Sequence, residues 1–305
     1  MKRSMLGVLL VLTFVAVGIA SAPPLTFTFS DVHATKTATE TDSYAVNDAG
    51  VIAGDYVDSS SVQHAMILAG TKLTTVNNSS CQSTGGLTGS IAFFGINSAG
   101  TAVGWCINIK TNLDESFTYS KGKFTPISFP KSNGTQATGI NDTGEIVGEY
   151  LDSSGNAHGF LLAKSKYTAI NVKGAAQTVA YGINNAGDIA AYSGSTISAG
   201  TVVCPCVGYI VKGTKFTKVS DPNAGTDGTV AHATNNKGQV VGTYYDSAGD
   251  VHGWLLDGGK YYELNDPTGC KCDTRGDGVN DTREIVGRYS TTLGGASIGF
   301  KATTK

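Results

Sequence analysis

Short runs of alternating hydrophobic and polar residues recur along the chain, and helical spacing is nowhere sustained. In one unit the four runs cover residues 136–141, 145–152, 157–163 and 166–172. A later unit has the same four runs at residues 231–235, 239–246, 251–256 and 260–265. Turn residues, chiefly Gly, Asp and Ser, separate the runs, a pattern typical of short β-strands joined by tight turns. The pattern predicts an all-β protein.

One short motif recurs six times and gives the period of the chain. An Asn closes a small-aliphatic-Asn run and a tight turn follows, at Asn47, Asn97, Asn141, Asn184, Asn235 and Asn280. Self-similarity at such a period indicates a repeat architecture, and four strands in about 45 residues are typical of a propeller blade. We expect a six-bladed β-propeller. A β-solenoid-like repeat array is the alternative.

The two ends of the chain appear complementary in the pattern. The sixth repeat has runs at 277–280, 284–289 and 297–302 but lacks a fourth run, whereas residues 25–32 resemble a fourth run without the other three. Pairing of 25–32 with 297–302 closes the ring and covers an open sheet edge. A solenoid does not need this exchange. Residues 23–305 are therefore predicted to form a single domain.

The first 22 residues have the pattern of a secretory signal peptide. Two basic residues at positions 2 and 3 precede an apolar stretch from Met5 to Ile19, and cleavage after Ala20 or after Ala22 fits the small residues that follow. An uncleaved membrane anchor is the alternative. We expect an extracellular or periplasmic protein that has no membrane contact after cleavage.

Composition changes this picture little. Charged residues make up 15% of the chain, and the 22 basic and 24 acidic residues form no basic cluster. This argues against nucleic acid and anionic membranes as partners. We expect a monomer whose partner is a neutral polymer or another protein.

Aromatic residues mark the third run of the repeats, with Met66 in their place in the first repeat, and a His stands two places before three of these six residues. The pairs are His64-Ala65, His158-Gly159 and His252-Gly253. With the recurring Gly-Ile-Asn turn, this His-small-aromatic pattern resembles the HAF-repeat family of probable extracellular bacterial repeat proteins, over essentially the whole mature chain. The resemblance implies export and a repeat architecture. It implies no chemistry, since that family has no established activity.

The three histidines recur with three aspartates that precede them by six residues each. The set comprises Asp58, Asp152, Asp246, His64, His158 and His252. Successive histidines are 94 residues apart, since 158 − 64 and 252 − 158 both equal 94, and so are successive aspartates. Residues on the third strand of alternate blades lie too far apart to share one zinc ion. We expect a local Asp–His pair across each hairpin, with three separate weak metal or ligand sites as the alternative. No metal or cofactor is predicted.

Five of the six cysteines fall in connections between runs, and Cys106 ends a second run. The six are Cys81, Cys106, Cys204, Cys206, Cys270 and Cys272. An even number in an exported protein favours disulfides. We expect Cys81 to pair with Cys106, because adjacent blades bring them near. The two Cys-x-Cys pairs close on themselves or, alternatively, bind metal.

Catalytic signals are weak, since no hydrolase, metalloprotease, Walker or dinucleotide motif occurs. The best constellation is positional, because one residue stands three places before each recurring Asn, at Tyr44, Phe94, Thr138, Tyr181, His232 and Asp277. The weak catalytic candidates, suited by type to acid–base chemistry, are His232, Asp277, Tyr181, Tyr44 and Arg275. The sequence leaves open whether the protein is an enzyme and favours that it is not.

The connections that differ most between repeats are predicted to lie together on one face. They are residues 77–91, 193–206, 222–229 and 266–275, and we call this the long-loop face. Function concentrates in variable loops on a rigid scaffold. The sequence therefore predicts a binding or scaffolding module that acts through this face. The alternative is a propeller hydrolase or lyase that acts on an extracellular polysaccharide or peptide at the mouth of the channel.

Overall fold

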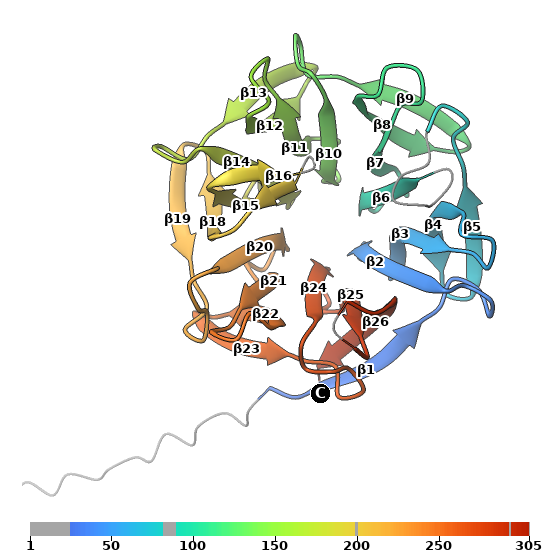
Figure 1. Cartoon of the computed structure of the whole chain (residues 1–305), viewed down its shortest axis with the longest axis vertical. Coiled ribbons are helices and arrows are strands. Elements are labelled where there is room, and N and C mark those ends of the chain that lie inside the picture. The colour runs from blue at the N-terminus through green and yellow to red at the C-terminus, as the bar shows by residue number, and fades with distance from the viewer. Residues whose placement is uncertain (1–24, 82–89, 199–200, 293, 305) are drawn as a thin grey trace, which may run out of the picture.

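The described part of the chain forms six four-stranded antiparallel sheets around a central channel. The computed structural model describes residues 25–81, 90–198, 201–292 and 294–304. In this part the sheets of four strands each radiate from the axis as the blades of a six-bladed β-propeller (Figure 1). The predicted fold is confirmed, and the solenoid alternative is wrong. The predicted signal peptide, residues 1–22, and residues 82–89 and 199–200 of the long loops lie outside the described residues.

Each blade has its four strands in chain order from the axis outward, except the last. Blade 1 contains β2 (Glu40–Val46), β3 (Val51–Val57), β4 (Gln63–Ala69) and β5 (Lys72–Val76). Blade 2 contains β6 (Ile91–Ile96), β7 (Ala102–Ile107), β8 (Asp114–Ser120) and β9 (Lys123–Ile127). Blade 3 contains β10 (Thr135–Ile140), β11 (Ile146–Leu151), β12 (Ala157–Ala163) and β13 (Lys166–Ile170).

The second half of the ring follows the same order. Blade 4 contains β14 (Gln177–Ile183), β15 (Ile189–Gly194), β18 (Val207–Lys212) and β19 (Lys215–Val219). Blade 5 contains β20 (Thr229–Thr234), β21 (Val240–Tyr245), β22 (Val251–Asp257) and β23 (Lys260–Leu264). Blade 6 contains β24 (Thr274–Val279), β25 (Ile285–Ser290), β26 (Ser297–Thr304) and, as its outer strand, β1 (Phe27–Val32).

The ring is closed by pairing the first strand with the last. β1 runs antiparallel to β26, with Phe27 opposite Thr304 and Val32 opposite Gly299. The Phe29 ring packs edge-on against the Phe300 ring, with centroids 5.3 Å apart. The predicted closure is confirmed, and it joins the two ends of the chain in one hydrophobic cluster.

The recurring Asn residues form the turns and also link the blades. The Asn141 Oδ1 accepts hydrogen bonds from the Thr143 and Glu145 backbone N–H groups at 3.2 and 2.9 Å, as expected for a side chain that stabilises its own turn. Its Nδ2 donates to the Asn184 carbonyl at 3.0 Å. The same side-chain bond runs from each Asn to the next, and Asn280 donates back to the Asn47 carbonyl at 3.0 Å. The six side chains therefore form a closed hydrogen-bonded ring.

Small residues let the inner strands approach one another. A Cβ added at Gly139 would lie 2.7 Å from the Tyr181 carbonyl, and one at Gly182 would lie 2.6 Å from the His232 carbonyl. Real Cβ atoms do not come so near to a backbone oxygen, so these two positions have room for glycine alone. Close packing at the axis keeps the channel narrow.

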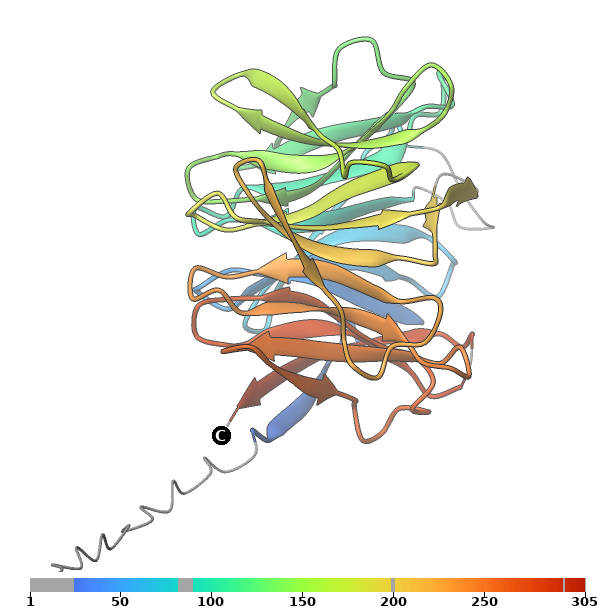
Figure 2. The same ribbon diagram turned by 90° about the vertical axis from the view of Figure 1, so that its left-hand side faces the viewer.

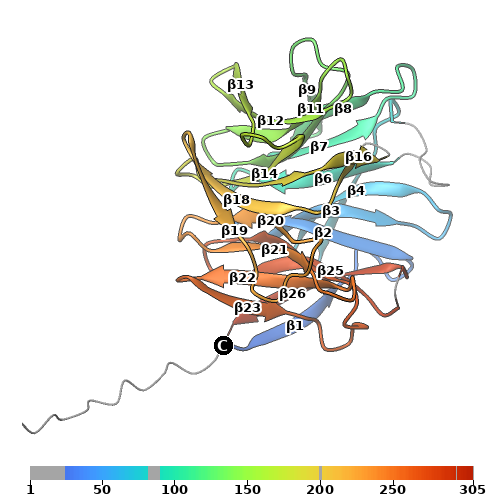
Figure 3. The ribbon, with the colours of Figure 1, turned by 60° about the vertical axis from the view of Figure 1, so that its left-hand side comes forward.

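The two faces of the ring differ in their connections. The turns from the first to the second strand of a blade are short, whereas the second-to-third connections and the links between blades lie on the opposite, long-loop face. The hairpin of β16 (Thr196–Ser198) and β17 (Thr201–Val203) projects from the long-loop face (Figures 2 and 3). Three disulfides lie in these connections or tie them to a strand, joining Cys81 to Cys106 of β7, Cys204 to Cys206 and Cys270 to Cys272. The Cys81–Cys106 pairing is as expected, and each Cys-x-Cys pair closes on itself.

Candidate functional site

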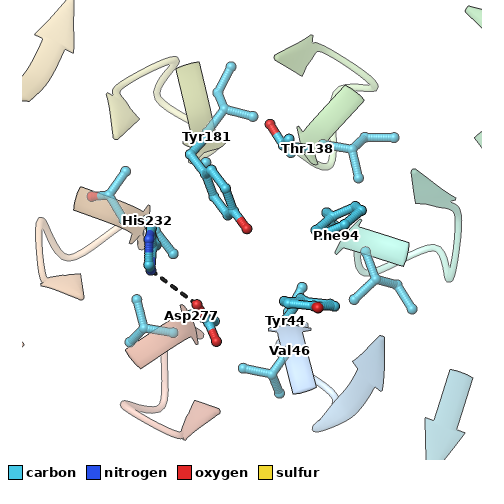
Figure 4. A pocket seen from close by; sticks show the side chains of 18 residues that line it. Tyr44, Val46, Phe94, Thr138, Tyr181, His232 and Asp277 are labelled. Carbon is cyan, nitrogen blue, oxygen red and sulfur yellow. Dashed lines mark ion pairs between the residues drawn. The ribbon is translucent and has the colours of Figure 1, made fainter. Parts of the chain in front are cut away.

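Each inner strand carries a β-bulge where it lines the channel. The strand register shifts between Ala137 and Gly139, for example, so that Thr138 lies outside the regular pairing. The equivalent bulged residues of all six blades are Tyr44, Phe94, Thr138, Tyr181, His232 and Asp277. A bulge re-aims a side chain, and Figure 4 shows these six residues gathered around the channel. They are the set that the sequence singled out three places before each Asn.

The channel contains two small cavities. The first has a volume of about 80 Å³ and is lined by the six bulged residues. The second, of about 70 Å³, lies at the ring of Asn side chains near the short turns. One residue from each blade borders both cavities, and five of the six are aliphatic: Val46, Ile96, Ile140, Ile183, Thr234 and Val279. This mainly apolar collar separates the two ends of the channel.

His232 and Asp277 meet in the first cavity. The His232 Nδ1 lies 3.1 Å from the Asp277 Oδ1 and also 3.1 Å from the Gly276 carbonyl oxygen, and Asp277 is only 2% exposed. Burial by itself raises the pKa of Asp277, but Arg288, whose Nη1 is 3.4 Å from its Oδ2, and His232 outweigh burial and lower that pKa. Asp277 is therefore a buried anion beside an imidazole.

The other catalytic candidates are placed differently. The Tyr181 ring packs on His232 with centroids 4.9 Å apart, and burial raises the pKa of Tyr181 far above its ordinary value. Tyr44 lies beside Asp277 in the ring (Figure 4), with the Arg288 Cζ 4.9 Å from the centre of the Tyr44 ring. Arg275 bonds the Asp273 Oδ1 through its Nε at 3.0 Å, and its charge is a minor cause of the lowered pKa of Asp277. Among the described residues it makes no hydrogen bond or ion pair to His232, Asp277 or the two tyrosines.

The size of the first cavity limits the chemistry at this group. Sites for small molecules have volumes of about 300 to 1,000 Å³, and the cavity of about 80 Å³ is well below that range. It accommodates a few waters and not a sugar ring or a peptide unit. His232 and Asp277 thus have the chemistry of an acid–base pair but no room beside them for a polymer.

A larger pocket opens where the channel reaches the long-loop face, between blades 1 and 2. Its volume is about 320 Å³, and its lining consists of Tyr44, Gln63, Ser90, Ile91, Ala92, Phe94, Trp105 and Ile107. We call it the aromatic pocket. The Phe94 ring lies 4.6 Å from that of Tyr44 and 5.7 Å from that of Trp105, and it is almost parallel to Trp105, at 9°. Tyr44 and Phe94 also line the first channel cavity, so the two spaces adjoin.

Trp105 was not singled out by the sequence analysis. It stands on β7 directly after Gly104, the position that Asp55 occupies after Gly54 and Glu149 after Gly148 in the adjacent blades. The residue at this position differs between blades, and it is Asp55, Trp105, Glu149, Tyr192, Thr243 and Arg288 in turn. A single sequence therefore gave no signal that marked Trp105. All three aromatic residues of the pocket are only partly buried, so their rings are accessible from the long-loop face.

The connection that follows β7, next in sequence to the pocket residue Ile107, exposes apolar side chains and is firmly held. Among the described residues, the large hydrophobic side chains that are exposed are Ile109, at 58%, and Leu113, at 43%. Both belong to the connection that follows β7. The Cys81–Cys106 disulfide and a 2.8 Å bond from the Ile109 N–H to the Ser80 carbonyl fix this connection to the neighbouring loop. The chain next to the pocket is therefore held in place.

Polar groups lie behind the pocket. The Gln63 Nε2 donates to the Asp55 Oδ2 at 2.8 Å, and the Tyr44 hydroxyl donates to the Asp42 Oδ2 at 2.9 Å. Gln63 and Tyr44 both line the pocket, so the two carboxylates orient side chains that a ligand would touch. At the position of blade 3 that matches Asp55, burial and then the nearby Asp114 charge raise the pKa of Glu149 to about 8.

The three Asp–His pairs are present as predicted. The His Nε2 to Asp Oδ2 distances are 3.1, 3.1 and 3.3 Å for His64, His158 and His252. The structure adds two partners that the sequence analysis missed, because an Asn side chain borders each Nδ1 and a Tyr ring packs on each imidazole. These residues are Asn77, Asn171, Asn265, Tyr56, Tyr150 and Tyr244, which share the 94-residue spacing. Each His is thus held within its own blade.

The described residues contain no group of three or more His, Cys, Asp or Glu side chains arranged to hold a metal ion. They also include no helix long and apolar enough to cross a membrane.

The fold is shared with known lectins. No family model matches the chain, and neither does any curated protein. A solved variant of the Aleuria aurantia lectin in complex with Fucalpha1-6GlcNAc has a TM-score of 0.53 and 12% identity, with 88% of this chain and 94% of that chain covered. The SapL1 lectin in complex with alpha methyl fucoside gives 0.54 and 10%, with 89% and 95% covered. A protein of unknown function from Dyadobacter fermentans gives 0.54 and 11%, with 93% and 100% covered. At such low identities the likeness concerns the fold.

Proposed function

We propose that the protein is an exported binding module that holds a neutral carbohydrate chain at the aromatic pocket of its long-loop face. The observation that carries the proposal is the pocket itself, which has about 320 Å³ and three accessible aromatic rings. Ligand pockets of this size combine apolar walls with a few placed polar groups. A sugar ring has an apolar C–H face that packs on an aromatic ring and hydroxyls that reach a side chain such as Gln63.

The fold neighbours support the ligand class. Two of the solved lectins with this fold are described with fucose-containing ligands. We carry over only the class, a carbohydrate, because the identities are 12% and 10%. The absence of a basic cluster on this chain agrees with a neutral ligand.

Export is part of the proposal. Residues 1–22 have the signal-peptide pattern, and three disulfides in the long-loop connections suit an oxidising compartment. The proposed identification with the HAF-repeat family of probable extracellular bacterial proteins is consistent with both features. A scaffolding role, in which the exposed Ile109 and Leu113 of the connection after β7 contact another protein, is compatible with the same face.

The test is a titration of the mature oxidised protein against a panel of neutral oligosaccharides, followed by the same titration of two variants. Trp105→Ala is expected to weaken binding about tenfold or more, because aromatic anchors dominate such contacts. Trp105→Phe keeps a ring and is expected to retain most of the affinity. Unchanged affinity in Trp105→Ala contradicts the assignment to this pocket.

A hydrolase or lyase that acts on an extracellular polysaccharide or peptide is the second candidate. The observation that favours it is the 3.1 Å contact between His232 and Asp277 beside Tyr181. The channel cavity of about 80 Å³ argues against it. Turnover of a substrate by the purified protein, abolished in His232→Ala and in Asp277→Ala, would establish the enzyme and displace the binding module.

A further inference from the structure

Two carboxylates lie directly opposite each other behind the aromatic pocket. Asp42 on β2 and Asp55 on β3 are partners in the strand register. Directly opposed residues of antiparallel strands have Cβ atoms about 4.5–5.5 Å apart on one face of the sheet. Two like charges at this position destabilise a sheet unless something neutralises them.

Each carboxylate has one oxygen bonded and one left over. The Tyr44 hydroxyl bonds the Oδ2 of Asp42, and the Gln63 Nε2 bonds the Oδ2 of Asp55. The Oδ1 atoms of both residues are buried and have no hydrogen-bond partner among the described residues. Asp55 is 3% exposed and the Asp42 side chain 19%, so bulk solvent has little access to the pair. A buried carboxylate oxygen without a donor is costly.

The nearest cation, Arg288, does not supply a hydrogen bond to either of the two Oδ1 atoms. The Arg288 Nε is 3.9 Å from the Asp42 Oδ1, and its Nη1 is 3.4 Å from the Asp277 Oδ2. One guanidinium therefore faces Asp42 and the fully buried Asp277, and it makes no hydrogen bond to Asp55 among the described residues. The two buried Oδ1 acceptors belong to directly opposed residues, and a single proton is the smallest donor that could serve both.

We propose that Asp42 and Asp55 share one proton between their Oδ1 atoms, and that this carboxyl–carboxylate pair positions Tyr44 and Gln63 in the aromatic pocket. Neither residue lines the pocket, so both are positioning residues. The role in binding rests on the proposed carbohydrate-binding function, whereas the shared proton does not.

The charged groups around the pair agree with a retained proton. Burial, and after it the Asp42 charge, raise the pKa of Asp55 well above its usual range, although Gln63, Arg288 and Tyr44 act in the opposite direction. On β2, which also carries Asp42, burial and then the Asp42 charge raise the pKa of Glu40. The groups that face the pair are therefore Glu40 and Tyr44 from β2, Gln63 from β4 and Arg288 from β25. A lone arginine among them does not offset the carboxylates.

The sign of the pH effect follows from the raised pKa of Asp55. The folded protein keeps this proton at pH values where an unfolded Asp, with a pKa of about 3.9, has lost it. The contribution to stability is complete below about pH 4 and declines as pH rises through the folded pKa. Above that pKa two adjacent buried anions repel each other, and the contacts that hold Tyr44 and Gln63 loosen. Carbohydrate affinity therefore falls as pH rises.

The first experiment follows the side-chain carboxyl carbons by NMR during a pH titration of the mature protein without ligand. One Asp resonance is expected to titrate well above pH 4, and in Asp42→Asn the Asp55 midpoint is expected to move down, since the like charge is gone. Titration of both residues near pH 4 in the wild-type protein overturns the shared proton, whatever the ligand of the protein is.

The second experiment measures oligosaccharide affinity against pH in Asp55→Asn and in a control, Glu149→Gln, at the matching position of blade 3. Asn reproduces the protonated pair, because its Nδ2 donates to Asp42 while its Oδ1 accepts from Gln63. We expect the wild type and the control to lose affinity at least tenfold across the Asp55 titration, and Asp55→Asn to keep it. Loss of binding in Asp55→Asn at every pH, or a pH-independent wild type, overturns the positioning role. Absence of oligosaccharide binding in all three proteins refutes the proposed function. The NMR titration still shows whether Asp42 and Asp55 share a proton, because it needs no ligand.

Discussion

At the residue scale, the recurring Asn shows what sequence reasoning reaches and what it misses. The bonds from the Asn141 Oδ1 to the N–H groups of Thr143 and Glu145 are local and follow from residue type and turn position. The bond from its Nδ2 to Asn184 spans 43 residues and exists because the ring places equivalent turns side by side. Such a contact becomes visible only once the closed geometry is known.

The first prediction concerns this ring. Asn141→Ala removes five side-chain hydrogen bonds, three of them with backbone groups. Each bond with a backbone group has a net contribution of about 0.5–1.5 kcal/mol, and the variant is expected to destabilise the protein by about 2–4 kcal/mol. Chemical denaturation measures the loss. The control is Asn185→Ala, an exposed residue in the equivalent turn of blade 4 whose side chain bonds only the exposed Asp142 of the Asn141 turn, expected to cost less than about 1 kcal/mol. An equal cost for the two variants would contradict the structural role of the ring.

The second prediction concerns Glu149, whose pKa is raised to about 8 because it is 6% exposed and lies near Asp114. The folded state keeps this proton while the unfolded state, with a Glu pKa of about 4.3, releases it. Stability is therefore lost as pH rises, by about 1.4 kcal/mol per pH unit until about pH 8. Glu149→Gln carries no such group. Its stability relative to the wild type is expected to improve by about 3 kcal/mol between pH 5 and 7.5 in urea unfolding. Parallel pH profiles for the two proteins would show that Glu149 is ionised when folded.

At the element scale, the strands were predictable and their irregularities were not. The expected strands of blades 3, 5 and 6 agree with the structure to within a few residues, because alternation and turn glycines act locally. The β-bulges at Thr138 and its equivalents were missed, since one extra residue on one strand leaves no mark in a single sequence. The aromatic pocket was missed for a related reason. It combines Trp105 of β7 with Tyr44 of another blade.

The third prediction concerns the Cys81–Cys106 disulfide, which closes a loop of 25 residues beside the aromatic pocket. The chain-entropy relation gives about 3–4 kcal/mol of stabilisation for a loop of this length. The double variant Cys81→Ala/Cys106→Ala is expected to lose this amount in denaturant unfolding and to bind oligosaccharide more weakly. Cys270→Ala/Cys272→Ala is the matched control, because that disulfide spans 2 residues and constrains almost no loop. An equal loss of stability in the two double variants would contradict the claim that the Cys81–Cys106 disulfide stabilises the protein by closing its loop.

The fourth prediction concerns β1. Deletion of residues 23–33 exposes the edge of β26 and uncovers Phe300, so the protein is expected to aggregate or to melt at least about 10 °C lower. Phe29→Ala leaves the strand in place and tests the packing alone, with an expected loss of about 2–3 kcal/mol. Differential scanning calorimetry measures both. An unchanged melting temperature after the deletion would mean that ring closure does not stabilise the fold.

At the scale of the whole molecule, the same ring geometry that was predictable from the repeats restricts where function can lie. Close packing of the inner strands leaves the His232–Asp277 pair in about 80 Å³, whereas the long-loop face provides about 320 Å³ with accessible aromatic rings. The sequence indicated the face, because the long connections gather there. It gave no ligand, since the pocket is assembled from residues of two blades.

The central claim, that carbohydrate is held at the aromatic pocket, has a direct spectroscopic test because the chain has two tryptophans. Trp105 lines the pocket, and Trp254 is completely buried in blade 5. The measurement is the pair of indole N–H resonances during titration with the oligosaccharide that binds best. We expect the Trp105 resonance to shift and saturate with the calorimetric affinity while that of Trp254 stays in place. Calorimetric binding that leaves the Trp105 resonance unmoved would contradict the claim and locate the carbohydrate elsewhere on the propeller.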